Sequence, residues 1–405
     1  MSTYTPSRRS LLRAVTALGS LALAGCSGPA GEPTESASEP TTGAQPTTSP
    51  AFEVETVGEG FAHPWGLAVL PGETELLVTQ RPGTLSLLDL DSGAVQTVRG
   101  TPAVYASGQG GLLDVALDPR AGRDWVYLTY AATNGAGASA THLARGRLDR
   151  DEPALRDRSV LHVATPFVDS NAHYGSRVVF GPDEKLYVSV GDRQFKNFGP
   201  AHVAQDPSNE LGATLRLAPD GSIPADNPFV EADSAADAVY TYGHRNVQGM
   251  AVHPETGAIW QSEHGERDGD EINVLAAGGN YGWPLASTAC HYGSSDPVGD
   301  SPAERPEFEA PVYYWECGSG GFPPAGVAFG RGGAFPEWQG DLFVGSLAGQ
   351  ALARFSVEGQ SVGEPERLLA DRGWRIRAVE FGPESGQLYL AVDGGSAPVV
   401  KLVPR

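Results

Sequence analysis

The sequence predicts an all-β fold, a six-bladed β-propeller, from three observations. Glycine and proline are abundant, at 52 and 32 of 405 residues, whereas apolar residues at helical spacing are scarce. A short apolar run, a turn and a second, often aromatic run recur six times along the chain. The copies are spaced as blades with insertions would be, since a bare blade takes roughly 40–50 residues. No unit can bury its apolar face alone, so radial stacking gives them a shared core.

The repeats define the expected strands in order. They are LAVLP and ELLVTQ from Leu67, VALDP and WVYLTY from Val115, VVFGP and KLYVSVGD from Val178, MAVHP and AIWQSEHG from Met250, VAFGR and DLFVGSL from Val327, and VEFGP and QLYLAVD from Val379. Runs such as TLSLLDL, HLARGRLD, ATLRLAP, ALARFSV and VVKLVP supply outer strands. The terminal strands, near 52–57 and 399–403, are expected to close the ring within one blade. Insertions at 131–140 and 287–309 are expected as rim loops that decide substrate access. A pair of β-sandwiches is the alternative fold, and the even repetition counts against it.

The chain begins with features of an export and anchoring segment. Residues 1–25 hold the twin-arginine pattern SRRSLLR and an Ala/Leu-rich run that is short for a membrane span, as in a secretion signal. The run ends in LAGC, which places Cys26 where a lipoprotein signal carries its lipidated cysteine; an incidental free cysteine is the alternative. Residues 26–50, rich in Pro, Thr and Ser, predict a flexible tether to the propeller domain at 51–405. We therefore expect an exported, cell-surface or periplasmic lipoprotein anchored to the membrane.

Charge and cysteine content narrow the partners. The formal net charge of −21 and the lack of a basic patch oppose nucleic-acid binding. Apart from Cys26, the chain holds Cys290 and Cys317. In an exported protein these two are expected to pair and to close a polar, proline-rich insertion. Two buried free thiols are the alternative.

The stretch 241–284 gathers most of the candidate site residues. Two short strands, GMAVHP and AIWQSEH, form a predicted hairpin around the turn PETG. A hairpin returns the chain to where it began, so the charged flanks HRN and HGERDGDE lie at the same end. A guanidinium, amides and carboxylates at one rim suit an anionic ligand beside a hard cation. Solvated loop charges are the alternative for either flank alone.

Other strand ends add candidates from further blades. His173 precedes one core strand and Asp192 follows its partner, so both are expected at one rim, where the carboxylate would fix the imidazole tautomer and raise its basicity. A histidine that merely caps a strand end explains the spacing equally well. Arg245, Arg375 and Arg377 come from different blades, and three arginines around one channel of an acidic protein call for an anion. Salt bridges to nearby acids are the alternative for one arginine of the RIR pair.

With these motifs the chain resembles the soluble quinoprotein sugar dehydrogenases, the aldose or sorbosone dehydrogenase family that uses pyrroloquinoline quinone (PQQ) and calcium. The resemblance is carried by HPWGLAV, GQGGLLDVALDP, HYGSRVVFGPDEKLYVSVGD, YGHRNVQGMAVHP, SEHGERDGDEINVL, GGNYGWP, GDLFVGSL and RIRAVEFGP. These segments run in order over most of residues 52–405, so the match is specific to the family rather than to propellers in general. It implies an enzyme that oxidises the anomeric hydroxyl of an aldose to the lactone and passes electrons to an unknown quinone or cytochrome acceptor.

The resemblance also implies roles residue by residue. His173 would be the general base, Asp192 would orient it, and Gln109 would help to place the sugar. The carboxylates and quinone oxygens of PQQ would be held by Arg245, Asn246, Gln248, Arg375 and Arg377. The backbone carbonyls of Gly265 and Glu266 would bind the calcium ion that touches the cofactor, whereas Glu271 and Tyr281 would belong to a second, structural calcium.

Departures from the family pattern leave other functions open. Ala348 stands where the family often has a PQQ-contacting lysine, and GFPPAG at 321–326 replaces an APSG-like segment with a cofactor-contacting hydroxyl. Glu266 stands where proline is common, although a backbone ligand survives that change. A non-catalytic sugar- or calcium-binding propeller is therefore one alternative. A metal-dependent lactonase is another, and it would need several carboxylates converging on a channel metal.

Overall fold

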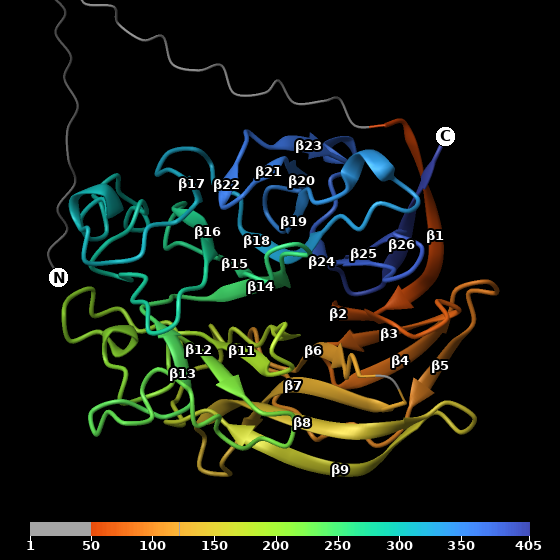
Figure 1. The fold of residues 1–405 in the computed structure, drawn as a ribbon, viewed down its shortest axis with the longest axis horizontal. Helices are drawn as coiled ribbons and strands as arrows, with labels where there is room; N and C mark the ends of the chain where they lie inside the picture. Colours follow the sequence, from red (N-terminus) through yellow and green to blue (C-terminus); the bar gives the residue numbers. More distant parts are fainter. Residues whose placement is uncertain (1–49, 121) are drawn as a thin grey trace, which may run out of the picture. The chain divides into compact units, whose positions relative to one another are not determined.

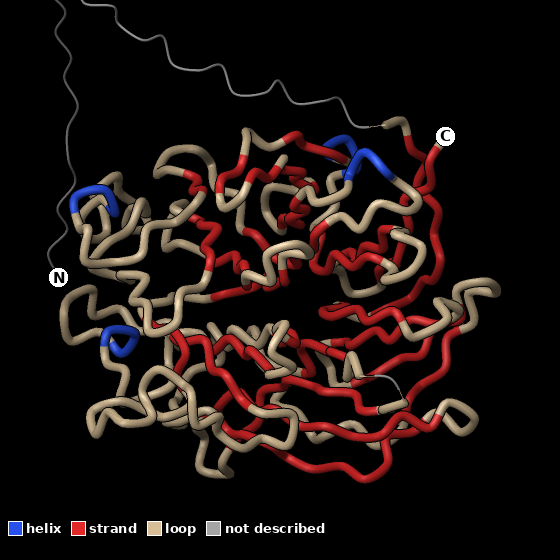
Figure 2. The backbone as a smooth tube through the Cα atoms, viewed as in Figure 1, coloured by secondary structure: helices blue, strands red, loops and turns tan. Residues whose placement is uncertain are grey.

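Six four-stranded antiparallel sheets stand around one central axis (Figure 1), in a computed structural model that describes residues 50–120 and 122–405. This confirms the predicted six-bladed β-propeller. Strands dominate the backbone, and the helical segments are short turns (Figure 2). Within the described residues, no helix is long and apolar enough to cross a membrane. The expected signal segment, Cys26 and nearly all of the tether lie outside the described residues.

The blades follow one another along the chain. From the axis outward they are blade 1, β2 (Pro64–Val69), β3 (Glu75–Gln80), β4 (Thr84–Asp89) and β5 (Val95–Val98); blade 2, β6 (Leu112–Leu117), β7 (Trp125–Thr133), β8 (Ser139–Asp149) and β9 (Ala154–Val163); blade 3, β10 (Val178–Phe180), β11 (Leu186–Val190), β12 (Ala213–Leu217) and β13 (Val239–Tyr242); blade 4, β14 (Val247–Val252), β15 (Ile259–Glu263), β16 (Asp270–Val274) and β17 (Tyr313–Trp315); blade 5, β18 (Pro324–Phe329), β19 (Leu342–Ser346), β20 (Leu352–Phe355) and β23 (Glu366–Leu368); and blade 6, β24 (Ile376–Phe381), β25 (Leu388–Val392), β26 (Ala397–Pro404) and β1 (Phe52–Phe61). In blades 1 to 5 the strands run from the axis outward in chain order, and blade 6 does the same from β24 to β26 before β1 is added on the outside. Smaller elements are the ribbon β21 (Val357–Glu358) and β22 (Ser361–Val362), and the 3-10 turns η1 (Val203–Gln205), η2 (Pro302–Glu304), η3 (Pro336–Trp338) and η4 (Ala370–Arg372).

The two ends of the chain close the ring in blade 6, as predicted. The first strand, β1, runs antiparallel to the last, β26, with Val54 opposite Leu402 and Thr56 opposite Val400. Figure 1 shows these strands side by side. This pairing joins the two ends of the chain in one sheet, so β1 completes blade 6 as its outermost strand.

Both faces of the inner strands of each blade are buried, which explains why these strands are nearly continuous apolar runs. In β3, Leu77 packs into blade 2, in a cluster with Val126. Its neighbours Leu76 and Val78 point the other way and pack with Tyr389 and other residues of blade 6. Alternate side chains of one strand thus fill alternate interblade layers, and the core runs around the ring.

Most inner strands are irregular where they begin. The register of β2, β6, β14, β18 and β24 shifts near the first residues, for example between Val247 and Gly249 and between Ile376 and Ala378. Such β-bulges bend the strand and re-aim its side chains. We call the end of the channel at which the inner strands begin the site rim, and the opposite end the far rim.

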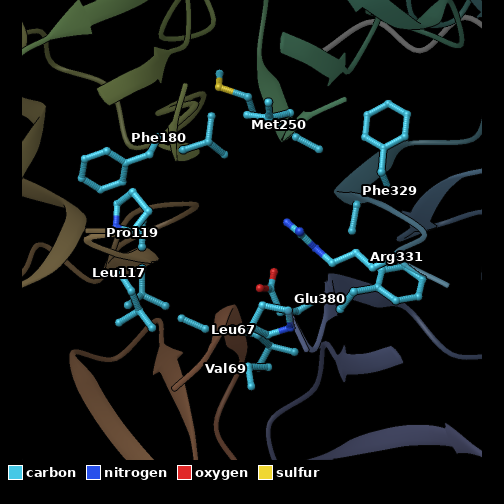
Figure 3. A pocket seen from close by; sticks show the side chains of 18 of the residues that line it. Leu67, Val69, Leu117, Pro119, Phe180, Met250, Phe329, Arg331 and Glu380 are labelled. Carbon is cyan, nitrogen blue, oxygen red and sulfur yellow. The ribbon is translucent and has the colours of Figure 1, made fainter. Parts of the chain in front are cut away.

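The far rim holds a cavity of about 560 Å³ lined by the ends of the inner strands from all six blades. Five blades place alanine or valine at the second position of the inner repeat, whereas blade 6 places Glu380 there. In Figure 3 the side chains of Glu380 and Arg331, from neighbouring blades, point into this apolar ring. No hydrogen bond to the Glu380 carboxylate is present among the described residues, so its charge is poorly compensated.

Glu380 is expected to make stability depend on pH. The apolar surroundings raise the pKa of Glu380 to about 8, against the opposing effect of Arg331. The folded state therefore binds more protons than the unfolded state between pH 4.5 and about 8, and stability falls as pH rises through that window. We expect Glu380→Ala to raise the free energy of unfolding by about 1–3 kcal/mol at pH 9 and to change it little at pH 4. Urea unfolding at both pH values measures this, with the exposed Glu384→Ala as the control; an equal effect at both pH values would contradict it.

Candidate active site

The site rim contains a second cavity, of about 300 Å³, which has the size of a small-molecule site. All six blades contribute to its lining, which includes the predicted residues Gln109, Asn246, Gln248, Arg375 and Arg377. These polar side chains are linked across blades. Arg377 Nη1 donates to Gln248 Oε1 at 2.9 Å, and Asn246 Oδ1 accepts from Gly175 N at 3.2 Å. The cavity is therefore a built polar pocket on the channel axis.

Guanidinium groups dominate the charge of this cavity. Arg375 and Arg377 lie 3.5 and 3.7 Å from the same carboxylate oxygen, Asp393 Oδ2. Arg81 also lines the cavity, and its buried Nε has no hydrogen-bond partner among the described residues. Burial lowers the pKa of Arg377 to about 10, against the effect of Asp393 and together with Arg177 and the other cavity arginines. Three cations against one carboxylate leave the cavity suited to an anion.

Arg81 was not predicted from the sequence. It directly follows the run ELLVTQ, at the same place in blade 1 that Gly191 and Asp192 occupy in blade 3. That equivalence was a usable signal, because both positions follow the second strand of a blade and so lie at the site rim.

Arg245 behaves differently from the other predicted arginines. It does not line the cavity. Its Nη2 contacts Glu266 Oε2 at 2.7 Å, and its Nη1 donates to His264 O at 3.1 Å. Lys196 Nζ lies 2.6 Å from the same Glu266 oxygen. The glutamate that replaces the family's usual proline thus holds both cations through its side chain.

A histidine–aspartate pair lies next to the cavity. His173 Nδ1 is 2.6 Å from Asp192 Oδ1, and both side chains are buried. Trp283 Nε1 donates to Asp192 Oδ2 at 2.9 Å, and His173 N donates to Gln109 Oε1 at 2.8 Å. With Nδ1–H donating to the carboxylate, His173 Nε2 is left as the acceptor.

Burial sets the protonation state of this pair. It lowers the pKa of His173, and the nearby charge of Arg245 lowers it further, against the effect of Asp192. Burial would raise the pKa of Asp192, but its contacts with His173 and Arg245 outweigh this and lower it. The pair therefore consists of a neutral imidazole and a carboxylate at neutral pH, which is the state a general base needs.

A pair of glutamates occupies the neighbouring hairpin of blade 4. Glu263 on β15 stands directly opposite Glu271 on β16, and both are buried. Burial and the charge of Glu263 raise the pKa of Glu271 well above its ordinary value. A space of about 10 Å³ adjoins them and is also lined by Gly265 and Tyr281. Like charges opposite each other on paired strands are destabilising, so this arrangement suits a cation between them.

The predicted ligands Gly265, Glu266, Glu271 and Tyr281 stay a prediction, to which the structure adds one candidate and in which it engages one side chain elsewhere. Glu263 was missed as a partner of Glu271, since strand register decides which carboxylates face each other. The Tyr281 hydroxyl donates to Val274 O at 2.6 Å and accepts from Ala276 N at 2.9 Å, so this hydroxyl is already engaged within the protein. Within residues 50–120 and 122–405, no cluster of three or more His, Cys, Asp or Glu side chains is suited to hold a metal. A cation here would need backbone carbonyls as well as the two glutamates.

The insertion at 287–309, beside this hairpin, is held by a disulfide bond. Cys290 and Cys317 form a disulfide, which ties the insertion to the end of blade 4. Cys317 N also donates to Thr288 O at 3.1 Å.

Ala348 and Pro323 line the arginine-lined cavity, so both departures from the family pattern lie against it.

The channel of this propeller holds an arginine-lined pocket beside a buried histidine–aspartate pair, an arrangement suited to an enzyme that binds a small anionic molecule. The chain belongs to the Glucose / Sorbosone dehydrogenase family, whose family model matches residues 61–401. This confirms the family and the enzyme class that the motifs predict.

Relatives match over nearly the whole length of the propeller. Aldose sugar dehydrogenase YliI of Escherichia coli strain K12 is 38% identical over 354 residues, which cover 87% of this chain and 93% of that protein. The solved apo-form of the soluble aldose sugar dehydrogenase from Escherichia coli superposes with a TM-score of 0.80 at 36% identity, over 88% of this chain and all of that one. The PQQ-bound aldose sugar dehydrogenase from Streptomyces coelicolor superposes with a TM-score of 0.70 at 29% identity, over 88% and 99%.

Proposed function

We propose that this protein is a PQQ- and calcium-dependent aldose dehydrogenase that oxidises the anomeric hydroxyl of a sugar to the lactone. The observation that carries the proposal is the arginine-lined cavity directly beside the buried His173–Asp192 pair. The PQQ-bound state of the Streptomyces coelicolor relative supports the choice of cofactor. Electrons would leave to an external quinone or cytochrome.

The cavity fits PQQ, a flat tricarboxylate. Arg81, Arg375 and Arg377 would hold its carboxylates, and the unpartnered Arg81 Nε is a donor that such an anion satisfies. Asn246 and Gln248 would face its quinone oxygens. With Ala348 in place of the lysine common in the family, one charged contact worth about 1.5–3 kcal/mol is absent, and Arg81 is the cavity cation that blade 1 supplies.

When bound, PQQ supplies the carbonyl that accepts hydride, and calcium polarises it. His173 Nε2 takes the proton of the anomeric hydroxyl. Asp192 holds the imidazole through Nδ1 and is itself fixed by Trp283. Gln109 lines the cavity and accepts a hydrogen bond from His173 N, so it ties the base to the sugar pocket.

The reaction class is tested by its product and isotope effect. Protein reconstituted with PQQ and Ca²⁺ would be given glucose with and without deuterium at C1, with an artificial dye as acceptor. Lactone formation with a slower rate for the deuterated sugar would support hydride transfer from C1. Tight sugar binding without turnover would instead support the non-catalytic sugar-binding propeller, to which the missing lysine at Ala348 points.

We propose Glu263 and Glu271 as the acidic ligands of the structural calcium, and Gly265 and Glu266 as carbonyl ligands of the calcium at the cofactor. Ca²⁺ at 100 times its Kd should stabilise the apo protein by about 2.7 kcal/mol. Glu271→Gln should remove most of that gain, because it leaves one carboxylate in place of two. Thermal unfolding with Ca²⁺ and with EDTA measures this, and the exposed Glu255→Gln in the same blade is the control. An unchanged calcium response in Glu271→Gln would exclude the site.

We also propose that the N-terminal segment exports the protein by the twin-arginine route and that a lipid on Cys26 anchors it. Cys26→Ala should release the protein from the membrane fraction while leaving its activity intact. Fractionation followed by a dye-linked assay measures both. Equal membrane association of the variant and the wild type would refute the anchor.

A further inference from the structure

A buried ion pair that has none of the roles assigned above contacts residues that line the arginine-lined cavity. Arg177 lies just before β10 in blade 3, and Asp114 lies on β6 in blade 2. Arg177 Nη1 is 3.1 Å from Asp114 Oδ1, and both residues are only about 5–6% exposed. Asp114 Oδ2 also accepts from Val178 N at 3.0 Å, so the carboxylate is fixed on both sides.

The remaining donors of this guanidinium reach across the channel. Arg177 Nε donates to Gln248 O at 2.5 Å, and Nη2 donates to Arg377 O at 2.9 Å. Its carbon Cζ lies 4.0 Å above the ring of Trp65. One side chain from blade 3 therefore contacts blades 1, 2, 4 and 6.

Its partners share a structural feature. Trp65, Asp114, Gln248 and Arg377 all lie within the register shifts at the start of their inner strands. A bulge leaves backbone groups outside the regular ladder, and two such carbonyls are the ones that Arg177 binds. Those carbonyls belong to Gln248 and Arg377, whose side chains are joined in the cavity by the 2.9 Å hydrogen bond from Arg377 Nη1 to Gln248 Oε1.

Stability alone does not explain the pair. Burial lowers the pKa of Arg177 and raises that of Asp114, so each charge is disfavoured by its surroundings. Buried ion pairs can often be replaced by apolar residues without loss of stability. The directional bonds to two carbonyls are what an apolar replacement could not supply.

We propose that Arg177, held by Asp114, is a positioning residue that sets the placement of Gln248 and Arg377 across the channel. This rests on the proposed function, in which those two residues hold PQQ. Lysine cannot replace it, because an ammonium group lacks the planar fork that reaches a carboxylate and two carbonyls together.

The test measures PQQ affinity of the apo protein by equilibrium dialysis for the wild type, Arg177→Lys and Asp114→Asn. We expect Arg177→Lys to weaken PQQ binding tenfold or more and Asp114→Asn to weaken it less, while the calcium-induced shift in melting temperature is retained. The matched control is Arg354→Lys in blade 5, away from the cavity, which alters another buried arginine whose guanidinium contacts Asp341 at 2.6 Å and Glu366 at 3.0 Å.

Each outcome decides the matter. Wild-type affinity in Arg177→Lys would overturn the positioning role and leave the proposed function standing. If Arg177→Lys and Arg354→Lys lost PQQ affinity equally, the positioning role would also be overturned, because the loss would then reflect a general effect on stability. Failure of the wild type to bind PQQ would overturn both proposals.

Discussion

Replacing His173 with alanine is expected to lower kcat for dye-linked sugar oxidation by about 10²- to 10⁴-fold, the usual contribution of a general base. The buried imidazole and Asp192 are 2.6 Å apart, which leaves Nε2 as the acceptor for the substrate proton. PQQ should still bind, because the cavity arginines come from other elements. Steady-state turnover and PQQ affinity of the variant measure the two expectations separately. Unchanged turnover would remove His173 from the mechanism.

The pH profile sharpens this prediction. Burial and Arg245 lower the pKa of His173, so the neutral base persists below the ordinary histidine value of 6.5. The acid limb of kcat/KM should therefore lie below pH 6.5. Asp192→Asn should also lower kcat, since an amide does not select the same tautomer. His142→Ala, on β8 in the outer part of blade 2, serves as the control that should leave the profile unchanged.

Arg377→Gln is expected to weaken PQQ binding by about ten- to more than a hundredfold, since a charged hydrogen bond contributes about 1.5–3 kcal/mol. The change removes a cation from the cavity and leaves Gln248 Oε1 without its donor. Equilibrium dialysis with the apo variant gives the affinity directly. Arg372→Gln, at an exposed turn of the chain, controls for net charge. Equal affinity in both variants would contradict an anion site at Arg377.

The inner half of each blade was predictable because both faces of those strands are buried, which leaves continuous apolar runs. Apart from β1, the outermost strands were not, because a strand such as β5 is mostly exposed and has little apolar pattern. The stretch 131–140 was expected as a rim loop, and this was wrong for half of it. Residues 131–133 end β7 and residues 139–140 begin β8, where Ala131 pairs with Thr141 and Thr133 with Ser139, so the connecting turn is only 134–138. Small residues resemble a loop in sequence, and here cross-strand pairing decides their structure.

The positions of the site residues at strand ends predicted that they lie at one rim, but did not predict where their side chains point. Arg245 faces Glu266, and Arg81 lines the cavity instead. The bulges that turn Gln248 and Arg377 into the channel leave no periodic signal in the sequence. The opposition of Glu263 and Glu271 depends on register, which a single residue of slip would undo.

The most direct test of the account is a titration of the apo protein with PQQ in the presence of Ca²⁺, followed by dye reduction with common aldoses. We expect saturable activity that reaches its plateau near one PQQ per chain and is lost when Ca²⁺ is chelated. No binding at micromolar PQQ, or binding without sugar-dependent dye reduction, would contradict it.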